Sequence, residues 1–202
     1  FGEHNLVLLP DTLMKLQPGK DLYTLITEAL EETGFSFLIK KEKNKDILKT
    51  KGAIYSISCP IPGCNKLYFG STKNQIKERV GQHLDNVTTL LTTSPPQSTD
   101  SFTQHLKRAH GDQFFNLFDN FINDNDFQED IGRAVLWQFF EAKMVKKGNC
   151  KYLDTMECTL CALERAIIWK GMHEGIAMNQ NKDWHGKCRH LQKKQVTNFV
   201  YL

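Results

Sequence analysis

Two short tyrosine motifs constrain the fold of this chain more than any other feature of its sequence. They are Ala53-Ile54-Tyr55 and Tyr68-Phe69-Gly70, and they lie in β-rich segments at 52–57 and 66–69. Between them stand three turn-forming residues, Pro60, Pro62 and Gly63. Two β-rich segments around such a gap are typical of a hairpin with an enlarged turn. The sequence therefore predicts that the two motifs lie on paired strands.

The residues after the second motif predict a helix at 72–86. Spacings of three and four place four of its residues on one face: Ile76, Val80, His83 and Leu84. Arg79 and His83 are one helical turn apart, so we expect their side chains to project together. This helix thus carries the first two polar residues that a site near the tyrosines would use.

Hydrophobic patterning predicts four further elements. They are a helix at 21–32, a short helix at 101–109, a central strand at 134–140 and a helix at 159–171. A stretch rich in Thr, Ser and Pro predicts a loop at 87–100, and one of its last residues caps the next helix: Ser98, Thr99 or Asp100. We divide the chain into an N-terminal helix and basic linker at 1–50, a main domain at 51–181 and a basic tail at 182–202.

Composition places the chain among ordinary globular proteins. Its 202 residues are 40% hydrophobic and 24% charged with a net charge of +3, which suits one substantial domain or two small ones. No apolar run approaches the roughly 20 residues that a membrane-spanning helix needs. Basic residues concentrate at 40–51 and 182–195, which suits a polyanion, although solvated lysine runs look the same. Because the chain starts at Phe1, we expect a piece of a longer protein.

Several polar residues follow the two motifs in a fixed order: Arg79, His83, Glu164 and Asn179. In this ordered set, over roughly residues 50–181, the chain resembles the GIY-YIG nuclease superfamily. Ala53 stands where the first family motif has Gly, and Phe69 where the second has Ile. The resemblance implies an α+β fold with a small, mostly antiparallel three-stranded sheet flanked by helices. Here a zinc-binding insertion and an N-terminal helical extension would be added to it.

The resemblance also implies a catalytic site that cleaves phosphodiester bonds. Its residues would be Tyr55, Tyr68, Arg79, His83, Glu164 and Asn179. Glu164 would anchor a catalytic Mg²⁺ or Mn²⁺, since hard cations prefer oxygen ligands and keep most of their waters. Arg79 offers a planar fork of donors for a phosphate. Taken singly, these residues also suit strand aromatics, a plain helix surface and a carboxylate near a helix start.

The tyrosines would act on the attacking water. Tyr55 is the candidate general base, but a free tyrosine has a pKa near 10, so it needs help from the metal and from a neighbour. His83 is that neighbour, or is itself the proton acceptor. Tyr68 would orient the water or the phosphate. Asn179 would support the site by hydrogen bonding, although Asn181 could serve in its place.

A second set of residues has the composition of a zinc site. Cys59 and Cys64 flank the predicted hairpin turn, and His105 and His110 lie on and just after the short helix. Two cysteines and two histidines suit a closed, structural, tetrahedral zinc site. Buried free cysteines are the alternative. Within a GIY-YIG core, this arrangement resembles the endonuclease domain of Penelope-like retroelements, in which a reverse transcriptase precedes the nuclease.

A further cysteine and histidine group leaves two interpretations open. Its candidate ligands for a second zinc are Cys158, Cys161, Cys188 and His190. Cys158 and Cys161 have the C-x-x-C spacing of metal ligands. The same spacing also places two residues on one face of a helix, where they would be core residues.

The function expected from the sequence is that of a metal-dependent DNA endonuclease that serves retroelement insertion. The alternative is an inactive, zinc-stabilised nucleic-acid-binding module on a nuclease fold. The candidate DNA-contacting residues are Lys66, Lys73, Lys77, Lys182, Lys187 and Arg189. DNA is the expected partner, and RNA is a further candidate. We also expect an upstream reverse-transcriptase domain in the full-length protein, and no membrane as a partner. Cysteines beside histidines favour reduced thiols, hence an intracellular setting, which would be nuclear in a eukaryotic host.

Overall fold

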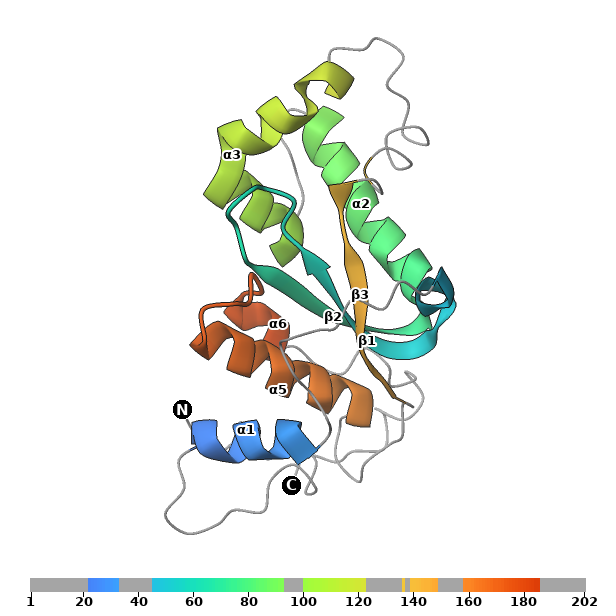
Figure 1. The fold of residues 1–202 in the computed structure, drawn as a ribbon, viewed down its shortest axis with the longest axis vertical. Helices are drawn as coiled ribbons and strands as arrows, with labels where there is room; N and C mark the ends of the chain where they lie inside the picture. Colours follow the sequence, from blue (N-terminus) through green and yellow to red (C-terminus); the bar gives the residue numbers. More distant parts are fainter. Residues whose placement is uncertain are drawn as a thin grey trace, which may run out of the picture.

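The computed structural model describes residues 22–32, 45–92, 100–122, 136, 139–148 and 158–185, and the statements below refer to these residues. At its centre is a sheet of three antiparallel strands in the order β2-β1-β3 (Figure 1). The strands are β1 (Lys51–Ser58), β2 (Leu67–Gln75) and β3 (Ala142–Lys147). The predicted α+β class, with a three-stranded antiparallel sheet flanked by helices, is confirmed.

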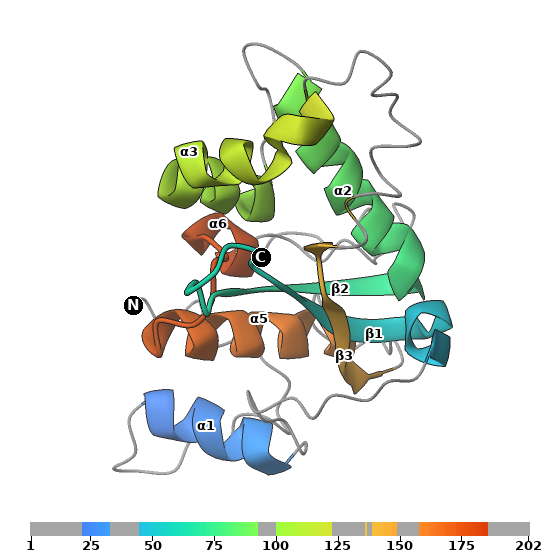
Figure 2. The same ribbon diagram turned by 45° about the horizontal axis from the view of Figure 1, so that its top comes forward.

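Helices cover both faces of the sheet. One face meets α2 (Ile76–Thr92) and α3 (Ser101–Ile122), and the other meets α5 (Thr159–His173) (Figures 1 and 2). The helix α1 (Leu22–Glu32) lies on the outer side of α5, where Ile26 and Leu30 are buried. Two short helices complete the described chain, η2 (Lys45–Lys49) and α6 (Asn181–His185).

The central strand β1 explains why two layers of core form. All five residues from Ala53 to Ile57 are buried, because β1 has a neighbouring strand on each side and helices on each face. Alternate side chains of a strand point to opposite faces. Tyr55 accordingly packs in the cluster under α2 and α3, whereas Ile54 packs in the cluster under α5.

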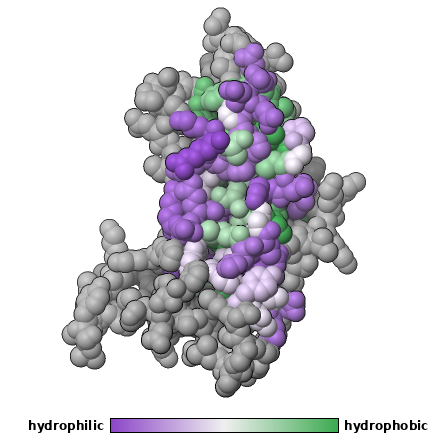
Figure 3. Space-filling model, turned by 90° about the vertical axis from the view of Figure 1, so that its left-hand side faces the viewer, coloured by the Kyte–Doolittle hydropathy of each residue, from purple (hydrophilic) through white to green (hydrophobic). Residues whose placement is uncertain are grey.

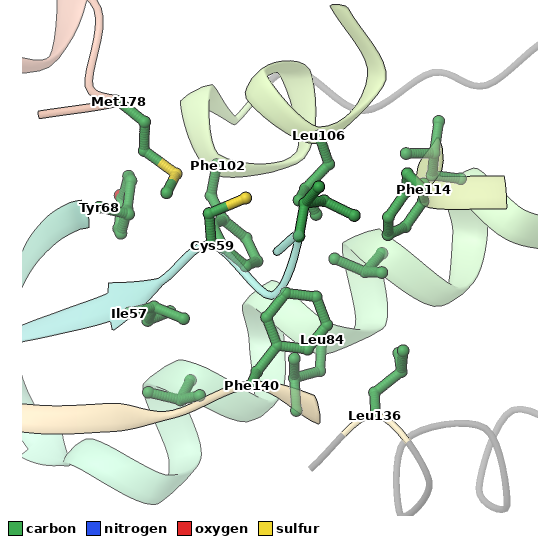
Figure 4. Packing of buried hydrophobic residues seen from close by; sticks show 14 of the residues in the cluster. Ile57, Cys59, Tyr68, Leu84, Phe102, Leu106, Phe114, Leu136, Phe140 and Met178 are labelled. Carbon is green, nitrogen blue, oxygen red and sulfur yellow. The ribbon is translucent and has the colours of Figure 1, made fainter. Parts of the chain in front are cut away.

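Several aromatic rings pack against one another in the cluster under α2 and α3 (Figure 4). The ring of Phe102 meets that of Phe140 edge to face, with centroids 5.2 Å apart. Phe118 continues the contact along α3, with its ring stacked on Phe140. Edge-to-face and stacked ring pairs are the arrangements that aromatic quadrupoles favour. This cluster therefore holds α3 against the sheet and the end of α2.

The predicted central strand at 134–140 is wrong. Leu136 and Phe139 are helical, and the Phe140 N–H donates to the Leu136 carbonyl at 3.1 Å, the bond of a helical turn. The third strand is β3, which begins later and lies at the edge of the sheet. A short apolar run has no periodicity that separates a strand from a buried helical turn. Here Leu136 and Phe140, four residues apart, both enter the aromatic cluster.

Three boundaries also differ from the prediction. β2 continues through Thr72 to Gln75, so α2 begins at Ile76 rather than at residue 72. α2 continues to Thr92 into the predicted loop at 87–100, with residues 93–99 outside the described ranges. α3 runs from Ser101 to Ile122 and not only to 109, with a kink at His110, where φ is −135°. In α2 the polar, Thr-rich end hides the extension, and its Thr hydroxyls bond back to helix carbonyls four residues earlier, as in Thr88 to Leu84 at 3.0 Å.

The remaining helix predictions are confirmed with small shifts. α1 and α5 lie where the patterning predicts them, and α5 ends beside Gly175, whose φ of +68° suits a glycine. Part of the expected basic linker is ordered as η2. Across the described ranges, the structure contains no helix that is both long and apolar enough to cross a lipid bilayer.

Candidate active site and metal centre

Three of the predicted site residues meet on the α2 and α3 side of the sheet. The hydroxyl of Tyr55 on β1 and Nε2 of His83 on α2 share a hydrogen bond of 2.8 Å. The ring of Tyr68 on β2 stands edge-on to the His83 ring, with centroids 4.8 Å apart. Tyr55 is 0% exposed and His83 2% exposed, so their bond is shielded from water. A hydrogen bond is electrostatically stronger in the interior of a protein than in water, so burial strengthens the bond between Tyr55 and His83.

The glycine of the second motif admits the Tyr55 hydroxyl. Gly70 is the cross-strand partner of Tyr55 in the β1–β2 ladder. A Cβ atom at position 70 would lie 2.4 Å from the Tyr55 oxygen, far inside van der Waals contact. Only a residue without a side chain allows the tyrosine to lie across its backbone. The pattern of tyrosine on one strand and glycine on the next therefore has a steric cause in this fold.

Asn179 fixes the backbone of the second motif. Its Oδ1 accepts from the Phe69 N–H at 2.8 Å, and its Nδ2 donates to the Phe69 carbonyl at 2.9 Å. Asn179 is 6% exposed, whereas Asn181 is exposed at the start of α6. Of the two asparagines that the sequence offered, Asn179 is therefore the one that supports β2.

Glu164 lies on the other side of the sheet from Tyr55. Its Oε2 accepts a hydrogen bond of 2.6 Å from the Ser71 hydroxyl, and it is 4% exposed on α5. Ser71 pairs with Ile54, which packs under α5. Tyr55 and Glu164 still contact consecutive residues of the outer strand β2. Tyr55 lies against Gly70, and Glu164 bonds Ser71.

Arg79 lies on α2 one turn before His83, as predicted. Its Nη1 donates to Oε1 of Gln82 at 2.6 Å, and it is half-buried. Neither of these facts places its guanidinium at Tyr55 or Glu164. The structure thus brings together Tyr55, Tyr68 and His83, and leaves Arg79 on the same helix with a local partner.

The sequence prediction missed a residue at this site, Asp100. Its Oδ1 lies 3.9 Å from Nδ1 of His83, on the opposite side of the imidazole from Tyr55. Burial of the Asp100 carboxyl opposes its ionisation, but His83 and Thr103 outweigh this effect and lower its pKa to about 2. The sequence indicated Asp100 only as one of three helix-cap candidates. No spacing rule connects it with His83, because Asp100 precedes α3 whereas His83 belongs to α2.

The four residues of the predicted zinc site do come together. The potential ligand atoms of Cys59, Cys64, His105 and His110 all lie within 4.8 Å of one another. Cys64 Sγ and His105 Nε2 are 3.5 Å apart. A tetrahedral zinc with bonds of about 2.0–2.3 Å holds its ligand atoms about 3.5 Å apart. The cluster therefore has the composition and nearly the spacing of a closed metal site.

The local structure directs these side chains inward. Cys59 follows β1, and Cys64 lies in the turn, where its N–H donates to the Ile61 carbonyl at 3.0 Å. The kink in α3 occurs at His110 itself, whose ring lies 5.0 Å from that of His105. Among the described residues, the buried Nε2 of His110 has no hydrogen-bond partner. A buried nitrogen without a hydrogen-bond partner lowers the stability of the folded protein unless another group binds it. A bound metal ion would be such a group.

The electrostatics of this cluster suit neutral ligands in the absence of a cation. Burial is the largest effect on the Cys59 thiol and raises its pKa to about 12. A hydrogen bond with the Ile61 backbone lowers this pKa, and the neighbouring Cys64 raises it. Burial, with His110 and Lys66 nearby, lowers the pKa of His105 to about 4. A neutral imidazole is the form that binds metals, and a bound divalent cation stabilises the thiolate. The donor set therefore fits zinc.

Cys158 and Cys161 behave as core residues in the described part of the chain. Cys158 precedes α5 as its N-cap, and its Sγ accepts from the Cys161 N–H at 3.4 Å. The two residues are 0% and 3% exposed within the apolar cluster under α5. The other two predicted ligands, Cys188 and His190, lie outside the described residues. A second zinc site stays a prediction.

The predicted DNA-contacting residues are dispersed over several elements. Lys73 and Lys77 are exposed near the β2–α2 junction, and Lys182 is exposed on α6. Lys66 is half-buried, and its Nζ donates to the Gly175 carbonyl. Lys187 and Arg189 lie outside the described residues. Polar side chains alternate with small apolar patches on the face shown in Figure 3, so the described part of this face has no continuous apolar surface.

Comparisons of the chain with protein-family models, with curated proteins and with solved structures found no significant match.

Proposed function

We propose that the protein is a metal-dependent endonuclease that hydrolyses phosphodiester bonds in DNA. The observation that carries the proposal is the buried hydrogen bond between Tyr55 and His83, which the absence of a side chain at Gly70 makes possible. A tyrosine bound to an imidazole nitrogen, beside a second tyrosine, is a proton-transfer arrangement that a structural core does not require. The ordered motifs of the sequence point to the same chemistry.

In the proposed reaction, a water oxygen attacks the phosphorus atom, the bond to the leaving oxygen breaks, and the leaving oxygen takes a proton from solvent. Tyr55 takes a proton from the attacking water, and its own hydroxyl proton passes to Nε2 of His83. The Tyr68 ring packs edge to face with the His83 ring and fixes its position. Arg79 neutralises charge on the phosphoryl oxygens through its fork of donors. Tyr55, Tyr68 and His83 come from β1, β2 and α2 and lie together on one side of the sheet. Arg79 would have to leave its bond with Gln82 to reach a phosphate beside them.

Glu164 is the residue that would hold the divalent cation. Its buried carboxylate beside the Ser71 hydroxyl offers oxygen atoms, the donors that Mg²⁺ and Mn²⁺ prefer. When bound, such a cation stabilises negative charge on the phosphate and the leaving oxygen. The side chains of the protein would remove the proton of the attacking water and neutralise charge on the phosphoryl oxygens.

The Cys59, Cys64, His105 and His110 cluster supports the finer part of the proposal. It would hold a structural zinc ion that ties the β1–β2 turn to α3. A structural zinc site between the two tyrosine motifs and α3 favours an enzyme of the Penelope-like retroelement type. Such an enzyme cuts target DNA for insertion and is joined to a reverse transcriptase. The exposed Lys73 and Lys77 would contact the DNA backbone.

Plasmid nicking by the purified protein with Mg²⁺ or Mn²⁺ tests the proposal. We expect Tyr55→Phe, which removes one oxygen atom, to lower the nicking rate about 100-fold or more, and Glu164→Ala to do the same. The matched control is Tyr23→Phe, which removes the same oxygen from a tyrosine on α1 that is 37% exposed. Nicking at the wild-type rate by both site variants would overturn the proposal.

Two observations favour a second candidate, a nucleic-acid-binding module without catalysis. Tyr55 is fully buried, and Glu164 reaches β2 from the opposite face of the sheet. The endonuclease proposal therefore requires that DNA binding opens access to the Tyr55 hydroxyl. Tight binding of a DNA duplex with no cleavage in Mg²⁺, Mn²⁺ or Co²⁺ would select the binding module.

A further inference from the structure

His83 is enclosed by groups from three elements besides its own helix. β1 contributes the Tyr55 hydroxyl, which is bonded to Nε2, and β2 contributes the ring of Tyr68. The start of α3 contributes the Asp100 carboxylate, whose Oδ1 lies 3.9 Å from Nδ1. Phe102 packs against the ring with centroids 5.9 Å apart. Among the described residues in this shell, Asp100 is the charged partner of the imidazole.

Asp100 is itself held by both helices. Its Oδ1 accepts from the Thr103 N–H at 2.8 Å, and its Oδ2 accepts from the Thr103 hydroxyl at 2.9 Å. Asn86 on α2 donates from Nδ2 to Oδ2 at 2.5 Å. These bonds fix the carboxylate relative to α2, the helix that carries His83. A carboxylate with three donors stays ionised, so its charge faces the imidazole permanently.

We propose that Asp100 is a positioning residue that acts through His83. It holds the imidazole with Nε2 toward Tyr55, and its negative charge stabilises the imidazolium that forms when His83 receives the Tyr55 proton. In this step the proton leaves the Tyr55 oxygen and binds His83 Nε2, while Asp100 remains ionised throughout. The inference rests on the proposed endonuclease function.

The chemistry of the imidazole ring explains why such a carboxylate matters. A neutral imidazole accepts through one nitrogen only when the other nitrogen carries the proton. A negative charge near Nδ1 favours the tautomer protonated there, which leaves Nε2 free to accept from Tyr55. The same charge raises the proton affinity of the ring, since an opposite charge within about 4–6 Å shifts such an equilibrium by a pKa unit or more. His83 thereby becomes a stronger base for Tyr55.

The substitution Asp100→Asn tests this role. Asparagine caps a helix about as well as aspartate, so the start of α3 is preserved while the charge is removed. The matched control is Asp112→Asn, which makes the same change at an exposed position of the same helix. We expect Asp100→Asn to lower the plateau nicking rate about tenfold and to move the acidic limb of the pH–rate profile about 1 unit lower. The control should leave both unchanged.

The direction of the pH shift separates a positioning role from a structural one. Without the carboxylate, His83 loses its proton at a lower pH. The neutral imidazole that accepts the Tyr55 proton is therefore present at lower pH, but it is a weaker base. A variant that only damages the fold would lower the plateau without moving the limb. A reduced rate with an unmoved limb would therefore overturn the inference.

A second readout does not depend on nuclease activity. Ring ¹⁵N resonances of His83, followed by NMR over pH, give its titration midpoint and its tautomer. We expect the midpoint to be about 1 unit lower in Asp100→Asn than in wild type, and unchanged in Asp112→Asn. If the wild-type protein cleaves no DNA but the midpoint shifts, the endonuclease proposal fails while the coupling of Asp100 to His83 stands. An unshifted midpoint refutes the coupling itself.

A double-mutant cycle completes the test. If Asp100 acts through His83, then Asp100→Asn should cause no further loss of rate in a His83→Ala background. Independent effects would instead multiply to a loss about tenfold greater than that of His83→Ala alone, and would assign Asp100 a role elsewhere.

Discussion

The two faces of the sheet use the same residue types in different ways. Under α2 and α3, two cysteines converge with two histidines, and a third histidine lies between a tyrosine and an aspartate. Under α5, two cysteines are buried among apolar side chains, and one carboxylate bonds a serine. The residue type of a cysteine pair or a buried acid thus does not decide its role. The side chains that the fold brings opposite it decide whether it is a metal ligand, a base or part of the core.

Replacing one cysteine on each face gives the largest expected contrast. We expect one equivalent of zinc in the wild type and none in Cys59→Ser, which should also lower the free energy of unfolding by several kcal/mol, because a structural zinc contributes directly to folding. Cys161→Ser should keep this zinc, because it lies in the other cluster. Metal analysis and chemical denaturation measure both effects. Equal zinc content in the two variants would remove the distinction between the faces.

The two asparagines near β2 offer the next largest effect. Asn179→Ala removes both bonds to the Phe69 backbone and leaves buried groups unpaired, so it should destabilise the protein by about 3 kcal/mol. Asn181→Ala, at an exposed position, should change stability by less than about 0.5 kcal/mol. Urea denaturation curves would compare the variants. Similar losses for both would show that Asn179 does not hold the second motif.

Acid should weaken the α2 and α3 face through Asp100. Its pKa falls from 3.8 to about 2 on folding, so its contribution is complete above the unfolded value and disappears as the pH drops toward 2. This contribution is about 2 kcal/mol at neutral pH. The difference in unfolding free energy between wild type and Asp100→Asn should therefore shrink between about pH 5 and pH 2. A difference that stays constant over this range would contradict the shifted pKa.

A glycine comparison gives the smallest expected change in stability. Gly70→Ala places a methyl group against the Tyr55 hydroxyl and should cost about 1–2 kcal/mol while impairing nicking. Gly81→Ala, in α2 with open space around it, should stabilise the protein by up to about 1 kcal/mol. Thermal denaturation and nicking assays measure both outcomes. A neutral Gly70→Ala with wild-type nicking would mean that Tyr55 need not lie across the strand.

How far the site could be predicted depends on how local its signal is. The hairpin, the tyrosines and the cysteine and histidine cluster were predictable, because β-rich segments, turn residues and ligand types leave marks in short stretches of sequence. The strand expected at 134–140 was wrong, since an apolar run of that length fits either a strand or a helical turn. Asp100 was missed for a different reason. Its partner His83 is on another helix, and helix capping alone accounted for its residue type.

The sequence by itself determined the hairpin of β1 and β2, the presence of the main helices and the set of residues able to bind a metal. These follow from periodicity and composition, which act between near neighbours along the chain. Only the tertiary structure decided that Tyr55 crosses Gly70 to reach His83, that Asp100 faces the same imidazole, and that Glu164 approaches β2 from the opposite face. These relations depend on how helices pack across a sheet, and that packing is set by the sum of many weak contacts between distant residues.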